Sequence, residues 1–94
     1  MSLTYIFGDT TLIRFLEALL EHPDMTLTLS EWATKAGIAN SSMSRIYPEL
    51  IKKKIIVVAG TINNMKLVQL NKEEPIVEAL MKFYAEIKKL ISGE

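Results

Sequence analysis

The sequence contains no cysteine among its 94 residues. This absence excludes disulfide bonds, thiolate catalysis and zinc sites built on cysteine, and it fits a reducing cytoplasm. Histidine occurs once, as His22, and the four glycines are scattered rather than gathered in a phosphate-binding loop. The carboxylates are spread along the chain, so no pair of nucleophile and base can be proposed. We therefore expect a protein that is not an enzyme and that uses no metal and no cofactor.

Long apolar runs are also missing. No stretch approaches the roughly 18 to 20 apolar residues that span a membrane, and no basic segment precedes an apolar one as in a signal peptide. Hydrophobic residues nevertheless make up 49% of the chain, far above the level of disordered proteins. We expect one cytoplasmic domain over residues 1–94, with apolar surface left over for a partner. A second copy of the chain is the simplest partner.

The net charge is zero, but the charges are unevenly distributed. Residues 1–39 hold two basic and five acidic residues, a net charge of −3. Residues 40–66 hold five basic residues against one acidic residue, a net charge of +4, and residues 67–94 have a net charge of −1. A basic middle segment inside a neutral chain indicates one surface suited to a polyanion.

Helix signals recur along the chain, and no element is predicted before Gly8. Asp9 is placed to cap a first helix, which ends at His22-Pro23 because the residue before a proline avoids the α region. The remaining predicted elements are a short extended piece at Thr26-Leu27, a helix over about 29–36, a helix from Asn40 or Ser41 to about Lys53, a hairpin over 55–70 and a helix over 75–91.

The second and third helices carry the most informative spacing. Thr28 and Glu31 form the pattern of a capping box, Leu27 and Trp32 that of a hydrophobic staple, and Gly37 is suited to a left-handed C-cap. Ala33 is small enough for close helix approach, and the core positions are predicted to be Trp32, Ala36, Ile38, Met43, Ile46 and Leu50. This spacing predicts a helix-turn-helix.

Two β-rich runs flank Asn63-Asn64, and asparagine tolerates the positive φ of a two-residue turn. In the register of a regular hairpin, one face covers the helices and carries Val57, Ala59, Val68 and Leu70. The predicted fold class is mainly α with a β-hairpin wing: a three-helix bundle, a two-stranded wing and a C-terminal helix. Residues 6–71 form the core and wing, and residues 75–91 form the last helix.

The outward face of the third helix is predicted to enter the major groove of DNA. The predicted DNA-binding residues on this helix and the wing are Asn40, Ser41, Ser42, Ser44, Arg45, Tyr47, Lys52, Asn63, Asn64 and Lys66. The guanidinium of Arg45 matches guanine O6 and N7. Either Ser41 or Ser42 also caps the helix.

Several of these residues also have structural interpretations that stay open. Arg45 is otherwise a solvated surface side chain, and Tyr47 either bonds a phosphate or packs. For Lys52, Lys53 and Lys54, interaction with the helix dipole is favoured over phosphate contact. Asn63, Asn64 and Lys66 form either a DNA contact or a plain polar turn.

The last helix has a broader apolar stripe than one domain needs, with heptad-like spacing. It is predicted to pair with its two-fold mate through Ile76, Leu80, Phe83, Tyr84, Ile87, Leu90 and Ile91. The alternative is that it folds back on the first helix and leaves the protein monomeric.

The segments Phe7–Thr11, Leu29–Ala33, Gly37-Ile38 and Ser42–Arg45 together resemble winged-helix transcriptional regulators of the ArsR and MarR kind, especially archaeal members. Ile46–Leu50 is similar to the Tyr-Pro signature in the recognition helix of PadR-type regulators. The passage from Leu70–Lys72 to Pro75–Val77 also resembles the exit from the wing in archaeal members. The resemblance covers about residues 6–91 and implies dimeric, sequence-selective DNA binding. Lys54 departs from the pattern, because members usually have a glycine after this helix, so the turn must differ or carry strain.

The sequence therefore predicts a homodimeric regulator of transcription that binds double-stranded DNA and acts as a repressor. The alternative is a winged-helix module that binds another protein and has no DNA function, which the zero net charge and the weakly basic wing favour. Neither an effector nor an operator can be read from the sequence.

Overall fold

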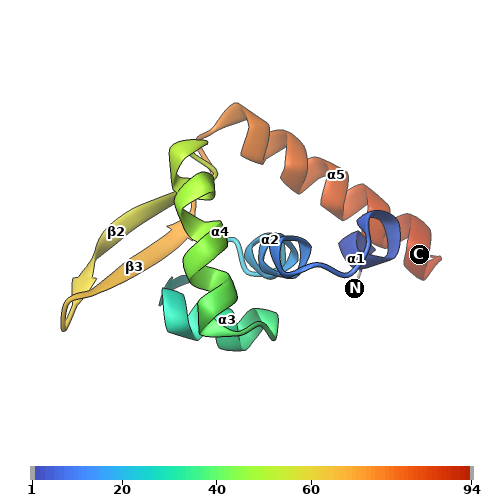
Figure 1. Cartoon of the computed structure of the whole chain (residues 1–94). Coiled ribbons are helices and arrows are strands. Elements are labelled where there is room, and N and C mark those ends of the chain that lie inside the picture. The colour runs from blue at the N-terminus through green and yellow to red at the C-terminus, as the bar shows by residue number, and fades with distance from the viewer. Residues whose placement is uncertain (1, 94) are drawn as a thin grey trace.

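The computed structural model describes residues 2–93. The elements in chain order are α1 (Ser2–Phe7), α2 (Thr11–Glu21), β1 (Thr26–Thr28), α3 (Leu29–Ala36), α4 (Asn40–Lys52), β2 (Ile56–Ile62), β3 (Met65–Leu70) and α5 (Pro75–Ser92). In Figure 1 the β2–β3 hairpin projects to one side of the helices, while α5 runs away from it until it lies beside α1. This arrangement confirms the predicted winged helix-turn-helix.

Local hydrogen bonds explain why α3 begins and ends where it does. The Thr28 hydroxyl accepts from the backbone N–H of Glu31 at 3.2 Å, and the Glu31 carboxylate accepts from the N–H of Thr28 at 2.9 Å. Gly37 ends the helix with φ +71°, a left-handed conformation that costs glycine little. The predicted capping box and C-cap are both confirmed. They fix the sharp turn that sends the chain into α4.

The cap of α2 differs from the prediction. Thr10, not Asp9, is the N-cap residue, and its hydroxyl accepts from the N–H of Ile13 at 3.2 Å. Asp9 instead accepts two hydrogen bonds from the Arg14 guanidinium, which also donates to the carbonyl of Gly37 at 3.0 Å. The interaction with Arg14 lowers the pKa of Asp9 and raises that of Arg14, mainly through these hydrogen bonds. Arg14 thus links the start of α2 to the turn between α3 and α4.

The core lies where α2, α3, α4 and the sheet meet. Trp32 is fully buried, as predicted, and its ring packs edge-on against Phe15 with centroids 6.1 Å apart. The indole Nε1–H donates to the carbonyl of Val68 at 2.8 Å. This bond satisfies the polar atom of a buried indole, and it connects the helix-turn-helix directly to the wing strand β3.

The sheet has three strands in the order β1-β3-β2, all antiparallel. Val68 and Leu70 are buried as predicted, but Ala59 is exposed and Val57 only half-buried. The cause is an irregularity between Val58 and Gly60, where Ala59 has no partner. This extra residue shifts the register by one, so Ile56 pairs with Leu70 and takes the buried position.

Two helices, α1 and α5, complete the fold and meet at the end opposite the hairpin. α1, which was not predicted, packs against α2 and α5 and buries Leu3. Its N-terminal backbone is held by Glu17, whose carboxylate accepts from the N–H of Leu3 at 2.7 Å. Proline at the first turn begins α5, as predicted. Within residues 2–93, no helix is both long and apolar enough to cross a membrane.

Candidate nucleic-acid interface

The solvent-facing side of α4 is polar and unobstructed near its N-terminus. Asn40, Ser41, Ser44 and Arg45 are exposed, as the prediction for this helix requires. Met43 and Leu50 are buried on the opposite side and anchor the helix to the core. The apolar stripe thereby fixes which polar side chains α4 presents to solvent.

The N-terminus of α4 differs from the prediction in one respect. Its N-cap residue is Ala39, and no side chain caps the helix. The expected cap from Ser41 or Ser42 is therefore wrong, since both residues lie inside the helix rather than before it. The hydroxyl of Ser41 is consequently not used as a cap.

Ser42 was predicted on the DNA-facing side, but it is buried. It precedes Met43 by one residue and Ile46 by four, which places it within the wide inward arc of an amphipathic helix. The hydroxyl of Ser42 accepts a hydrogen bond of 3.4 Å from Nη2 of Arg45. Ser42 thus lies on the inner side of α4 and contacts Arg45, which is exposed.

Tyr47 and Lys66 connect α4 to the wing. The ring of Tyr47 is half-buried, and the Lys66 ammonium lies 5.4 Å from the ring centroid. A cation at this distance from an aromatic face is attracted by the ring quadrupole. Tyr47 therefore packs against the core, which is one of the two alternatives left open for it, and Lys66 lies over this residue of α4.

The tip of the wing is polar at its turn and apolar on either side. Asn63 and Asn64 have φ of +50° and +65°, as a primed two-residue turn requires. Ile62 and Met65 pair across the strands beside them and are 52% and 46% exposed. The hairpin tip thus presents two amides and two apolar side chains to solvent.

Lysines occupy the C-terminal end of α4. Lys52, Lys53 and Lys54 are all exposed. Lys54 has φ +63°, a left-handed conformation that is costly for a residue with a Cβ. The strain expected at this position from the absence of glycine is therefore present. The turn is held by bonds from Lys54 N–H to the Ile51 carbonyl and from Asn71 Nδ2 to the Lys54 carbonyl, both 3.0 Å.

The predicted dimer residues of α5 lie in different environments. Ile76, Phe83, Leu90 and Ile91 are 40% to 70% exposed, and Leu80 and Ile87 are half-buried. Tyr84 is only 5% exposed because it packs inside the monomer, so it does not belong to an exposed α5 face.

The exposed face of α5 continues onto α1, which the sequence reasoning missed. The rings of Phe7 and Phe83 lie with centroids 6.3 Å apart, and Tyr5, Ile6 and Phe7 are all more than 40% exposed. Leu3, Ile6 and Phe7 have the i, i+3, i+4 spacing of a helix face. This signal is weak in the sequence because the helix is only six residues long.

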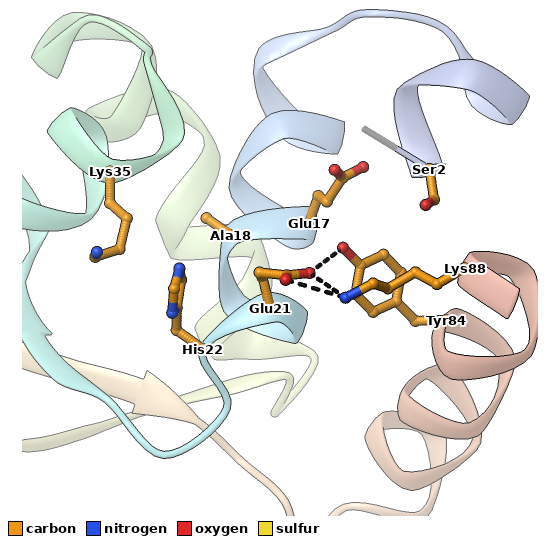
Figure 2. A pocket seen from close by; sticks show the side chains of 8 residues that line it. All are labelled: Ser2, Glu17, Ala18, Glu21, His22, Lys35, Tyr84 and Lys88. Atoms are coloured by element: carbon orange, nitrogen blue, oxygen red, sulfur yellow. Dashed lines mark hydrogen bonds and ion pairs between the residues drawn. The ribbon is translucent and has the colours of Figure 1, made fainter. Parts of the chain in front are cut away.

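Figure 2 shows how Tyr84 joins α5 to α2 at an open pocket of about 280 Å³. The Tyr84 hydroxyl donates to the Glu21 carboxylate, and Lys88 Nζ donates to both Glu21 oxygens at 3.0 and 3.1 Å. The bond from Tyr84 is the largest cause of the lowered pKa of Glu21, and burial is the largest cause of the raised pKa of Tyr84. Across the described residues, no group of three His, Cys, Asp or Glu side chains could hold a metal.

Comparison with solved structures finds the same fold in proteins of very different sequence. MepR, a transcription regulator of the Staphylococcus aureus multidrug efflux pump MepA, superposes with a TM-score of 0.64 at 20% identity over 97% of this chain and 68% of its own. A MarR family transcriptional regulator from Silicibacter pomeroyi gives 0.62 at 14% identity, over 94% and 63%. A mutant of S. aureus MepR bound to an oligodeoxyribonucleotide gives 0.61 at 19% identity, over 99% and 70%.

The present chain spans about two thirds of the length of these solved chains. No family model matches the sequence, and no curated protein matches it. At sequence identities of 14% to 20%, the superpositions establish a shared fold. The archaeal character suggested by the sequence stays a prediction. The chain has the winged helix-turn-helix fold that MarR-family transcription regulators share.

Proposed function

We propose that this protein is a sequence-specific DNA-binding regulator of transcription whose helix α4 lies in the major groove. The observation that carries the proposal is the division of α4 into a buried face with Met43 and Leu50 and an exposed polar face with Ser44 and Arg45. A helix held in this way beside a β-hairpin is the geometry with which winged helix-turn-helix proteins dock. The DNA-bound MepR mutant of the same fold supports the proposal.

Each exposed side chain on α4 has a role that its chemistry suits. Arg45 presents five donors in a planar fork, the geometry that pairs with O6 and N7 of guanine. Asn40, Ser41 and Ser44 are short donors that reach base edges or phosphates without blocking the approach of the helix. Lys52 at the far end of α4 contacts the phosphate backbone.

The proposal includes a homodimer formed through α5 and α1. Exposed apolar side chains continue from Phe7 to Phe83 and along α5 to Leu90 and Ile91. Contiguous apolar surface of this kind favours association in water. A two-fold dimer would place two α4 helices about 34 Å apart, one turn of B-DNA. Such a dimer would cover a promoter and act as a repressor in the cytoplasm.

The experiment is selection of bound sequences from a pool of random duplex DNA by the full chain, followed by fluorescence anisotropy on the enriched duplex. We expect two half-sites related by two-fold symmetry, with centres about 10 base pairs apart. We also expect an affinity that falls steeply with salt, since phosphate contacts release counterions. No enrichment over the starting pool would refute the proposal. Enrichment of a single half-site would retain DNA binding and refute the dimer.

The second candidate function is a module that binds another protein. Ile62 and Met65 favour it, because they expose apolar surface at the wing tip where a DNA-binding wing usually carries charge. Purification on immobilised protein at low salt distinguishes the two functions. A stoichiometric protein partner, together with no retention on duplex DNA, would establish this alternative.

A further inference from the structure

Strand geometry places Lys66 on the side of the wing that faces the helices. Successive residues of a strand point to opposite faces, so Lys66 shares a face with Val68 and Leu70. These two residues are 0% and 2% exposed and lie in the core. Lys66 continues the same face beyond the core, where α4 places Tyr47 beneath its ammonium at 5.4 Å. The only cation of the β2 and β3 strands is therefore directed at the recognition helix and not at the wing tip.

A hollow of about 290 Å³ opens beside this pair. Three segments far apart in the sequence line it: the start of α3 with Ser30, α4 with Tyr47, and the wing with Asn64 and Lys66. The hollow thus lies between the two elements of a winged helix that contact DNA, the wing and the recognition helix. Its lining contains one positive charge, an amide, three hydroxyl groups and two apolar side chains, and none of its lining residues is acidic. Of the hydroxyls, that of Thr28 already accepts the N–H of Glu31 in the capping box, while Ser30 and Tyr47 have no such role.

The one carboxylate on α3 is that of Glu31, which follows Ser30. This carboxylate accepts the backbone N–H of Thr28 at 2.9 Å as part of the capping box and does not line the hollow. The donors around the hollow suit a compact anion that accepts several hydrogen bonds. The aromatic ring under Lys66 also restricts its side chain, which lowers the entropy lost when the ammonium binds an anion.

We propose that this hollow seats one phosphate group of the DNA backbone, held by the Lys66 ammonium and the hydroxyls of Tyr47 and Ser30. The inference rests on the proposed function and deepens it. The cation–π contact makes Tyr47 a positioning residue for Lys66, so the recognition helix and the wing contact the backbone as one unit. The tip residues Ile62, Asn63, Asn64 and Met65 then bear no charge toward the DNA.

The test measures DNA affinity across salt concentrations for the intact chain, four single variants and two double variants. Lys66→Gln removes the charge from an exposed side chain, and Lys82→Gln is the matched control on α5, where Lys82 is 78% exposed and pairs only with Glu78 in the described residues. One lost phosphate contact reduces the slope of log K against log salt by about 0.9. If the parent chain and the variant bind equally at 1 M salt, this difference in slope makes the variant bind about fivefold more weakly at 0.15 M salt.

We expect Lys66→Gln to show both changes and Lys82→Gln neither. Tyr47→Phe should keep the full salt slope, because the ring still supports Lys66, while losing affinity through the missing hydroxyl. Tyr47→Leu also removes the ring, so it should lower the affinity of the parent chain further than Tyr47→Phe does. In the Lys66→Gln variant, where the ring has no ammonium to support, Tyr47→Leu and Tyr47→Phe should lower the affinity equally. Thermal melting of each variant checks that folding is preserved.

The outcomes separate this inference from the proposed function. Steep salt dependence in the parent chain with an unchanged slope in Lys66→Gln would overturn the phosphate seat and leave DNA binding intact. Absence of DNA binding by the parent chain would overturn both. Titration with inorganic phosphate, followed by NMR of Lys66 and Tyr47, distinguishes the source of the anion. Saturation at micromolar phosphate, with no effect of Lys66→Gln on DNA binding, would assign the hollow to a free anion and contradict the proposal.

Discussion

Replacing Lys54 with glycine should stabilise the protein. Lys54 is exposed and has φ +63°, and a side chain with a Cβ costs about 1–2 kcal/mol in the left-handed region. Glycine relieves this strain but loses about 0.5–1 kcal/mol through the greater freedom of the unfolded chain. The net gain is about 0.5–1 kcal/mol, which corresponds to a rise in Tm of about 2–8 °C for a domain of this size. The bond from the Lys54 N–H to the Ile51 carbonyl and the bond from Asn71 Nδ2 to the Lys54 carbonyl use only backbone atoms of residue 54, so both are retained.

The neighbouring residue supplies the control. Lys53 has φ −83° and gains nothing from glycine, so Lys53→Gly should destabilise the protein by about 0.5–1 kcal/mol. Urea unfolding followed by circular dichroism, at one fixed protein concentration, measures both changes. Equal destabilisation by the two substitutions would refute the argument that the exit from α4 is strained.

Four further predictions concern helix α4, the core, the α2–α5 contact and the dimer. Arg45→Ala should weaken binding to the selected duplex by about 1–3 kcal/mol without changing Tm, as measured by anisotropy and melting; undiminished affinity would remove its reading role. Trp32→Phe removes the indole donor to the Val68 carbonyl and shrinks a fully buried side chain, and it should cost about 1–3 kcal/mol in urea unfolding. Because folding lowers the pKa of Glu21 from its ordinary value of 4.5, the ionised carboxylate stabilises the folded protein at pH values above 4.5. This stabilisation is lost as the pH falls through the lower pKa of the folded state. Tyr84→Phe should therefore flatten the loss of stability below pH 4.5, and a curve parallel to that of the parent would contradict this cause. Leu90→Glu should convert dimer to monomer in sedimentation velocity at micromolar protein, and a persistent dimer would place the interface elsewhere.

The features that the sequence predicted well are those set by neighbouring residues. Thr28 and Glu31 are three residues apart and cap the same turn, whatever the rest of the chain does. Gly37 and the Asn63-Asn64 turn likewise depend on local backbone preferences. The burial of Trp32 followed from the apolar spacing of two adjacent helices. Together these signals were enough to predict the order of elements from α2 to α5 and the helix-turn-helix, while α1 was missed.

The errors arose where a competing contact or an irregular strand pairing decides where a side chain lies. Asp9 is a good cap by type, but Arg14 engages its carboxylate and Thr10 takes the cap position. The unpaired Ala59 exchanges the faces of β2. Its one sign in the sequence is Gly60, because an isolated glycine inside a strand often marks a bulge, and the regular hairpin register took no account of it. Tyr84 fits the heptad of α5, yet Glu21 on another helix draws it inside the monomer.

The same competition changed the predicted DNA-binding surface. Ser42 is polar and sits among polar residues, so its type gave no sign that the inward arc of α4 includes it. Lys66 could be placed near DNA from its position in the hairpin. Its contact with Tyr47, however, depends on the angle between wing and helix, which only the three-dimensional structure supplies.

The central claim is that the exposed face of α4 reads DNA from the major groove. Methylation interference on the selected duplex tests it most directly, because guanine N7 lies in the major groove and carries the contact assigned to Arg45. We predict that a methyl group at N7 of a guanine in each half-site abolishes binding, while the same modification outside the half-sites has no effect. Binding that tolerates N7 methylation at every guanine of the site would contradict the account.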